Sequence, residues 1–186
     1  QIQTDRDINR LAKEAQGLAA DGNYPAATAI WEQIVAWAIE QLGDQDPDTA
    51  FSLNNLAFLL NKQGAYSKAE PLHVRALAIR EKKLGPEHPD TAQSLNNLAT
   101  LYADQGAYRK AEPLYIRALA IREKALGHDH PETANSLNNL AFLYNDQGAY
   151  SKAEPLYIRA LAINEKTLGP EHPDTARSLR NLAFLY

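Results

Sequence analysis

Apolar residues recur along the chain at the spacing of one face of an α-helix. In residues 53–60 they occupy positions i, i+3, i+4 and i+7, from Leu53 to Leu60. The same stripe begins again at Leu95, Leu137 and Leu179. No stretch shows the strict alternation that is typical of a half-buried β-strand. The pattern therefore predicts an all-α chain.

The stripe repeats with a period of 42 residues. Residues 95–136 and 137–178 are identical at 33 of 42 positions. Such a period indicates stacked units, each burying its apolar face against its neighbours. We expect one repeat domain over residues 1–186, with units at about 5–46, 47–88, 89–130 and 131–172 and a lone first helix at 173–186. The first unit, which carries Trp31 and Trp37, is divergent or forms a cap.

Each unit is predicted to contain two helices. The first ends at a glycine such as Gly64, which can adopt a left-handed conformation. The sequence "SKAE" at residues 67–70 has capping-box spacing and predicts the start of the second helix, with Pro71 in its first turn. The next first helix is predicted to begin at Pro89, after His88.

These residues resemble the tetratricopeptide repeat. The pattern "LNNLAxLY…QGxYxKAEPLYxRALAIxEKxLGPEHPDTA" is similar to the 42-residue variant found in kinesin light chains and in many bacterial and cyanobacterial repeat proteins. The resemblance covers residues 47–186 closely and 5–46 loosely. It implies a right-handed superhelical solenoid of about four and a half antiparallel helix pairs. It also implies a concave groove lined by the first helices, which binds a protein or peptide partner.

The motif "SLNNLA" at residues 52–57 places two asparagines in each first helix. Asparagine costs about 0.5–0.7 kcal/mol relative to alanine inside a helix, so another role has to compensate. On a helical wheel the second asparagine, Asn55, lies opposite the apolar stripe, and Asn54 lies on the flank, where it could meet an adjacent first helix. The opposite face forms a strip in every unit, here called the first-helix strip: Phe51, Asn55, Phe58, Lys62; Gln93, Asn97, Thr100, Asp104; Asn135, Asn139, Phe142, Asp146; Arg177, Asn181, Phe184.

By resemblance to kinesin light chains, the second asparagine of each pair holds the ligand backbone, and an arginine reaches in from the second helix. The candidate groove residues are Asn55, Phe58, Lys62, Arg80, Asn97, Thr100, Asp104, Arg122, Asn139, Phe142, Asp146, Arg177, Asn181 and Phe184. Asn164 departs from the arginine pattern. Asn61, Ala103 and Asn145 stand where cargo-binding members often carry a basic residue, so an acidic ligand is not implied.

Two interpretations of the asparagines stay open at this point. They can line a ligand groove, or they can form amide ladders between stacked units with no ligand. The corresponding functions are an interaction scaffold that binds an extended or partly helical peptide, and a structural spacer or self-assembling array.

Composition and motifs argue against several other functions. The formal net charge is −4, which argues against general binding to nucleic-acid backbones, and the absence of cysteine excludes disulfides and cysteine-based metal sites. His88, His130 and His172 recur once per unit, which favours turn or helix-start roles over a metal site. No nucleophile or phosphate-loop motif occurs, so we expect no enzymatic activity and no cofactor. We also expect no membrane span and a cytoplasmic location.

The lone helix at residues 173–186 continues the apolar stripe through Leu179, Leu182, Ala183 and Tyr186. Since no second helix follows, part of this face should stay uncovered. We expect a monomer in dilute solution and end-to-end association through this helix at high concentration.

Overall fold

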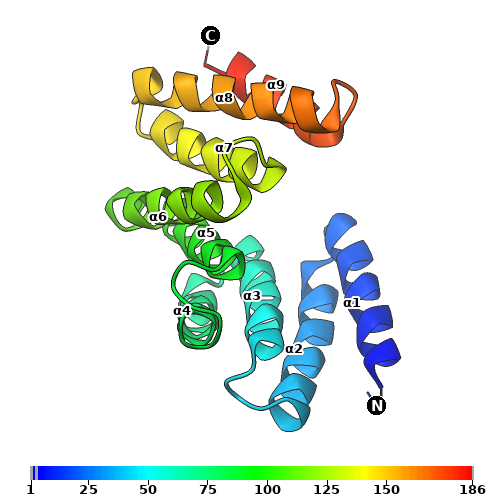
Figure 1. Ribbon diagram of the computed structural model, residues 1–186. Helices are drawn as coiled ribbons and strands as arrows, with labels where there is room; N and C mark the ends of the chain where they lie inside the picture. The colour runs from blue at the N-terminus through cyan, green and yellow to red at the C-terminus, as the bar shows by residue number, and fades with distance from the viewer. Residues whose placement is uncertain (1, 3, 186) are drawn as a thin grey trace. The chain divides into compact units, whose positions relative to one another are not determined.

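A computed structural model describes residues 2 and 4–185 of the chain. These residues form nine α-helices and no strand, which confirms the all-α prediction (Figure 1). The helices fall into two compact units, residues 1–86 and 87–186. The expected single domain over residues 1–186 stays a prediction.

The first compact unit contains four helices, each packed against the next along the chain. They are α1 (Asp5–Ala20), α2 (Tyr24–Gln41), α3 (Pro47–Lys62) and α4 (Tyr66–Lys83). Trp31, Ile34, Leu53 and Ile79 lie in its core. Trp31 is buried, whereas Trp37 is only half-buried.

The second compact unit contains α5 (Pro89–Asp104), α6 (Tyr108–Leu126), α7 (Pro131–Asp146), α8 (Tyr150–Leu168) and α9 (Pro173–Ala183). Successive helices pack together, and α7 also contacts both α5 and α9. The first helices of neighbouring repeats therefore lie side by side. Leu95, Leu137 and Leu143 are completely buried, and Tyr115 and Tyr157 join this core.

Helix starts at the first helices follow the sequence prediction. Pro89 is the first helical residue of α5, and the Nδ1 of His88 accepts a hydrogen bond from the Asp90 backbone N–H at 3.1 Å. His130 and His172 cap α7 and α9 in the same way. The recurring histidines are thus N-caps, which satisfy N–H groups that have no partner inside the helix.

The predicted start of the second helices is wrong by two residues and in its chemistry, because the N-cap is Ala65 and not Ser67. α4 begins at Tyr66, and its N-cap Ala65 offers no side-chain hydrogen bond, so Ser67 lies inside the helix and Pro71 lies in the second turn. The reason is the preceding turn. Gly64 has φ +72°, and the Ala65 N–H bonds back to the Leu60 carbonyl at 2.9 Å. This closure makes the C-terminal turn of α3 run directly into α4 and leaves no separate capping residue.

Candidate functional site

The first asparagine of each pair links neighbouring first helices in the second compact unit. Asn96 Nδ2 donates to Ser136 Oγ at 3.0 Å, and Asn138 Nδ2 donates to Ser178 Oγ at 2.8 Å. All four side chains are buried. In each bond the asparagine and the serine come from successive copies of the "SLNNLA" motif, with Ser178 in the "SLRNLA" variant. The recurrence of a serine together with the asparagine in every copy was the signal that sequence reasoning missed. The first asparagines therefore form the structural ladder.

In the first compact unit the equivalent Asn54 is also buried, and its amide oxygen contacts a histidine. Its Oδ1 lies 2.9 Å from Nδ1 of His73, which is buried as well. Burial lowers the pKa of His73 to about 4, because the charged imidazolium would lose its hydration. His73 is therefore neutral at pH 7, and its Nδ1–H donates to the amide oxygen.

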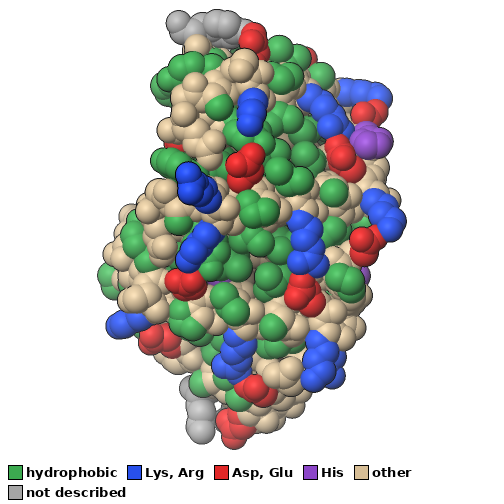
Figure 2. Space-filling view, turned by 90° about the vertical axis from the view of Figure 1, so that its left-hand side faces the viewer, with side chains coloured by type: hydrophobic (Ala, Val, Ile, Leu, Met, Phe, Trp, Pro, Cys, Tyr) green, Lys and Arg blue, Asp and Glu red, His purple; other side chains and the backbone are tan. Residues whose placement is uncertain are grey.

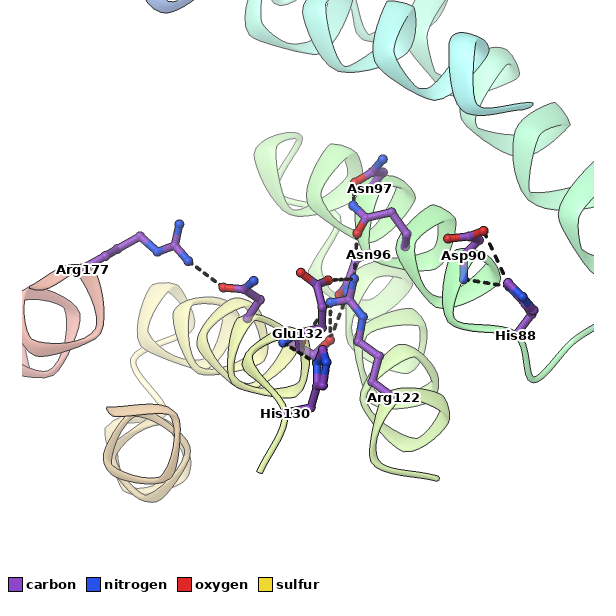
Figure 3. A network of polar contacts seen from close by, with 11 residues as sticks. His88, Asp90, Asn96, Asn97, Arg122, His130, Glu132 and Arg177 are labelled. Carbon is purple, nitrogen blue, oxygen red and sulfur yellow. Dashed lines mark hydrogen bonds and ion pairs between the residues drawn. The ribbon is translucent and has the colours of Figure 1, made fainter. Parts of the chain in front are cut away.

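Arg122, expected to reach a ligand, is bound within the protein (Figure 3). Its Nη1 donates to Ser136 Oγ at 2.9 Å and to the Glu132 carbonyl at 3.1 Å. Its Nη2 donates to Gln93 Oε1 at 2.6 Å and lies 2.8 Å from the Glu132 carboxylate. Burial lowers the pKa of Arg122, and the Glu132 carboxylate opposes that shift. The guanidinium thus joins α6 to α5 and α7.

Asn164 occupies the same repeat position as Arg122 and makes a shorter version of its contacts. Its Nδ2 donates to Ser178 Oγ at 3.1 Å and to the Asp174 carbonyl at 3.4 Å. Asparagine in place of arginine therefore keeps the hydrogen bonds to the following first helix, α9. Arg80, at the corresponding position of α4, is buried too.

The second asparagines lie on a different surface. In the second compact unit a hollow of about 390 Å³ is lined by Gln93, Asn96, Arg122, Glu132, Asn135, Asn138, Asn139, Phe142, Asp174, Arg177 and Asn181. Asn139 and Asn181 are half-buried, and their amides have no partner in the described part of the chain. Phe142 is exposed at the rim, and Arg177 Nη2 donates to Asn135 Oδ1 at 2.6 Å (Figure 3). This hollow brings part of the predicted strip together.

The strip residues of α5 are already engaged with each other or with the core. Asn97 Oδ1 accepts from Gln93 Nε2 at 3.0 Å, and Thr100 Oγ1 lies 2.8 Å from the Tyr115 hydroxyl. Asp104 is exposed. Asp146 is the corresponding strip residue of α7. Its pKa is raised mainly by burial and also by the negative charge of Asp104.

In the α3 strip of the first compact unit, Phe51, Phe58 and Lys62 are exposed and Asn55 is half-buried. Asn55 Nδ2 donates to the Phe51 carbonyl at 2.9 Å, one turn earlier in the helix. Phe58 is exposed, and Lys62 Nζ lies 5.3 Å from the centre of its ring. In α9's C-terminal turn, Phe184 is 76% exposed. The wheel thus placed this face correctly as the solvent side.

The apolar stripe of the lone α9 helix is partly uncovered. Leu179 is 56% exposed, whereas Leu182 is half-buried against the core of α5–α8. Tyr186, which the prediction included, lies outside the described residues. Whether this face supports self-association stays a prediction.

Other chemistry finds little support in the described residues. They contain no group of three or more His, Asp or Glu side chains that could hold a metal ion. No helix among them combines the length and apolar character needed to span a bilayer. Figure 2 shows a face on which acidic and basic side chains are interspersed with hydrophobic ones.

Comparisons with known proteins match this architecture. The family profile described as tetratricopeptide repeat matches residues 8–82, 52–124, 97–164 and 132–186. Two crystal structures of a Podosopora anserina protein, described as a kinesin light chain with nearly identical TPR-like repeats, are 29% identical. They align over 100% of this chain and 88% of that chain with TM-scores of 0.79 and 0.78.

A third similar structure is BtubC (BKLC) from P. vanneervenii. It is 26% identical, aligns over 96% of this chain and 71% of that chain, and has a TM-score of 0.79. A search of curated proteins gives no match. The repeat period, the paired helices and the four profile matches lead to one conclusion: this chain belongs to the tetratricopeptide repeat family, and its structural neighbours are kinesin-light-chain-like.

Proposed function

We propose that the chain is a protein-interaction scaffold that binds an extended or partly helical peptide along its first-helix strip. Tetratricopeptide repeats generally mediate protein–protein interactions, so the class of function follows from the family. The proposal goes further than the family, since it names the surface that binds and the conformation of the bound peptide. In it, the second asparagine of each pair holds the peptide backbone.

The observation that carries the proposal is the difference between the two asparagines of the α7 pair, Asn138 and Asn139. Asn138 is buried, and its side-chain N–H donates to Ser178. Its neighbour Asn139 lines the hollow with an amide that no described group bonds. The structural ladder accounts for Asn138 and leaves Asn139, a poor helix former at an interior position of α7, without a hydrogen-bonding role inside the protein.

The hollow has the chemistry to receive a peptide backbone. A side-chain amide offers two N–H donors and one acceptor, which match the carbonyl and N–H of an extended peptide. Phe142 adds an apolar contact at the rim. Glu132 pairs with Arg122, and Asp174 lies 3.0 Å from Arg177, so the local charges largely balance. We expect apolar anchors and backbone hydrogen bonds with little selectivity for charge.

Adjacent asparagines provide a matched test. A peptide selected by display on the parent chain is titrated against Asn139→Ala and Asn138→Ala, with affinity read by fluorescence anisotropy and stability by thermal unfolding. Asn139→Ala should weaken binding about tenfold at unchanged stability, since one bidentate contact to the peptide is lost and no hydrogen bond within the protein is. Asn138→Ala should lower stability. Unchanged affinity in the Asn139→Ala, Asn97→Ala double variant would overturn the assignment.

A chain that selects no peptide at all would favour the alternative function, a structural spacer. In that case the recurring hydrogen bonds of the Asn–Ser ladder alone would explain the repeated motif. Near-identical units would then serve to set a length between other parts of an assembly.

A further inference from the structure

A second hollow lies in the first compact unit, between α1, α2 and α3. Its volume is about 400 Å³, and it is lined by Ile8, Asn9, Ala12, Trp31, Ile34, Trp37, Ala38, Leu42, Asp48, Phe51 and Ser52. A cavity of about 150 Å³ is enough to hold benzene, so this one has room for a large side chain. Of the residues that line this hollow, Phe51 alone belongs to the first-helix strip.

This hollow is the counterpart of the region that Arg122 fills in the second compact unit. A shift of two 42-residue repeats relates the two sets of side chains. Gln93 corresponds to Asn9, Arg122 to Ala38, Glu132 to Asp48, and Ser136 to Ser52. The acceptors are thus retained in kind, whereas the arginine is replaced by alanine.

Without the arginine, the acceptors of the first unit lack their cation. Ser52 Oγ donates back to the Asp48 carbonyl at 3.0 Å, the same backbone position that accepts from Arg122 in the second unit. The Asp48 carboxylate is exposed and has no cationic partner among the described residues. None of the side chains that line the hollow is basic. The site therefore has a carboxylate, a carbonyl and a hydroxyl on one side, and no cationic side chain among the residues of α2 that line it.

The opposite walls are apolar and aromatic. The rings of Trp31 and Phe51 meet edge to face with centroids 6.0 Å apart. Trp37 and Leu42 complete the wall. Such walls suit an aliphatic stem and also attract a cation that passes over the ring faces.

We propose that this hollow is a pocket for an arginine side chain of the partner peptide, whose guanidinium takes the place that Arg122 occupies in the second unit. Its stem packs on Trp37 and Leu42, and its N–H groups bond the Asp48 carboxylate and carbonyl. Arginine fits better than lysine, because a planar fork of five donors can serve several acceptors at once. Phe51 belongs to the first-helix strip, so a peptide on that strip can place a side chain here. The inference rests on the proposed function in this respect.

The pocket carries its own reporter, since Trp31 and Trp37 are the only tryptophans in the chain and both line it. Short capped peptides with a central arginine, with citrulline, or with norleucine are titrated while tryptophan emission is recorded. The arginine peptide should give a saturable change, and citrulline, which is nearly isosteric and uncharged, should bind at least about tenfold more weakly. Equal binding of the three peptides, or no saturable change with the arginine peptide, would overturn the assignment.

Two variants test the same contact from the protein side. Ala38→Arg fills the pocket from within and should abolish the tryptophan response. Asp48→Asn is nearly isosteric and exposed, so it keeps the fold and should weaken the arginine peptide about tenfold. Glu32→Gln, an exposed charge change on α2, is the matched control and should leave binding unchanged. An arginine response that survives Asp48→Asn unchanged would rule out the proposed contact.

The readouts separate this inference from the proposed function. The display-selected peptide is followed by anisotropy in parallel with tryptophan emission. Anisotropy binding by the parent chain without any arginine-dependent tryptophan response refutes the pocket and leaves the groove intact. Absence of anisotropy binding refutes the proposed function itself.

Discussion

His73 makes the stability of the first compact unit depend on pH. The ring is 2% exposed, and its Nδ1 lies 2.9 Å from Asn54 Oδ1. Burial lowers its pKa from an ordinary value of 6.5 to about 4. The folded chain therefore holds this histidine neutral over a range in which the unfolded chain protonates it.

The sign and size of the effect follow from that interval. Above pH 6.5 the histidine is neutral in both states, and the stability is complete. As the pH falls below 6.5, the unfolded chain binds the proton first, so the free energy of unfolding decreases until about pH 4, where folded His73 is protonated as well. An interval of about 2.5 pH units, at ~1.36 kcal/mol per unit, corresponds to a loss of about 3 kcal/mol.

The substitution His73→Tyr isolates this contribution. The equivalent positions in the next two repeats are Tyr115 and Tyr157, and Phe142 accompanies Tyr157 as Phe58 accompanies His73, so tyrosine suits the repeat. Tyrosine does not titrate between pH 4 and 7. We expect the parent to lose about 3 kcal/mol more than the variant over this range, since the carboxylates titrate in both.

The assay is urea unfolding at a series of pH values, followed by tryptophan emission. Trp31 and Trp37 lie in the same compact unit as His73, so the signal reports the relevant part of the chain. Local reporting matters because repeat arrays can unfold in parts. Parallel pH profiles for the parent and His73→Tyr would refute the reasoning.

Three further predictions concern the second compact unit. Asn138→Ala should lower its stability by about 1–2 kcal/mol in urea unfolding, since the hydrogen bond to Ser178 is lost in a buried site; no loss would show that the ladder is inert. Arg122→Asn should be tolerated better than Arg122→Ala by about 1 kcal/mol in thermal unfolding, because asparagine can keep two of the contacts; equal costs would contradict this. Leu179→Lys with Leu182→Lys should reduce self-association in light scattering at high concentration, and unchanged scattering would exclude this face as the contact.

Much of the fold could be predicted because the repeat shows each position several times. The apolar stripe identified the buried face, and Gly64 and Pro89 marked helix ends through conformations that few other residues adopt. Ser67 misled the prediction, since capping-box spacing does not show whether the preceding turn leaves a residue free to cap. That depends on backbone hydrogen bonds formed by Ala65.

The side-chain partners were harder to predict. Asn96 and Ser136 are 40 residues apart, and only the stacking of α5 on α7 brings them together. Arg122 was expected at the ligand surface, yet a long side chain can bend into a gap between helices that a wheel does not represent. The hollow around Ala38 could not be predicted from the sequence. An alanine gives no sign of an empty space until the structure shows that Arg122, at the same repeat position, fills it.

The most direct test of the central claim is a crystal structure of the chain bound to a display-selected peptide. We predict that Asn139 and Asn181 hydrogen-bond the peptide backbone, while Asn96 and Asn138 keep their bonds to the serines of the next first helix. A peptide bound on the second helices, with the Asn139 and Asn181 amides left in solvent, would contradict it.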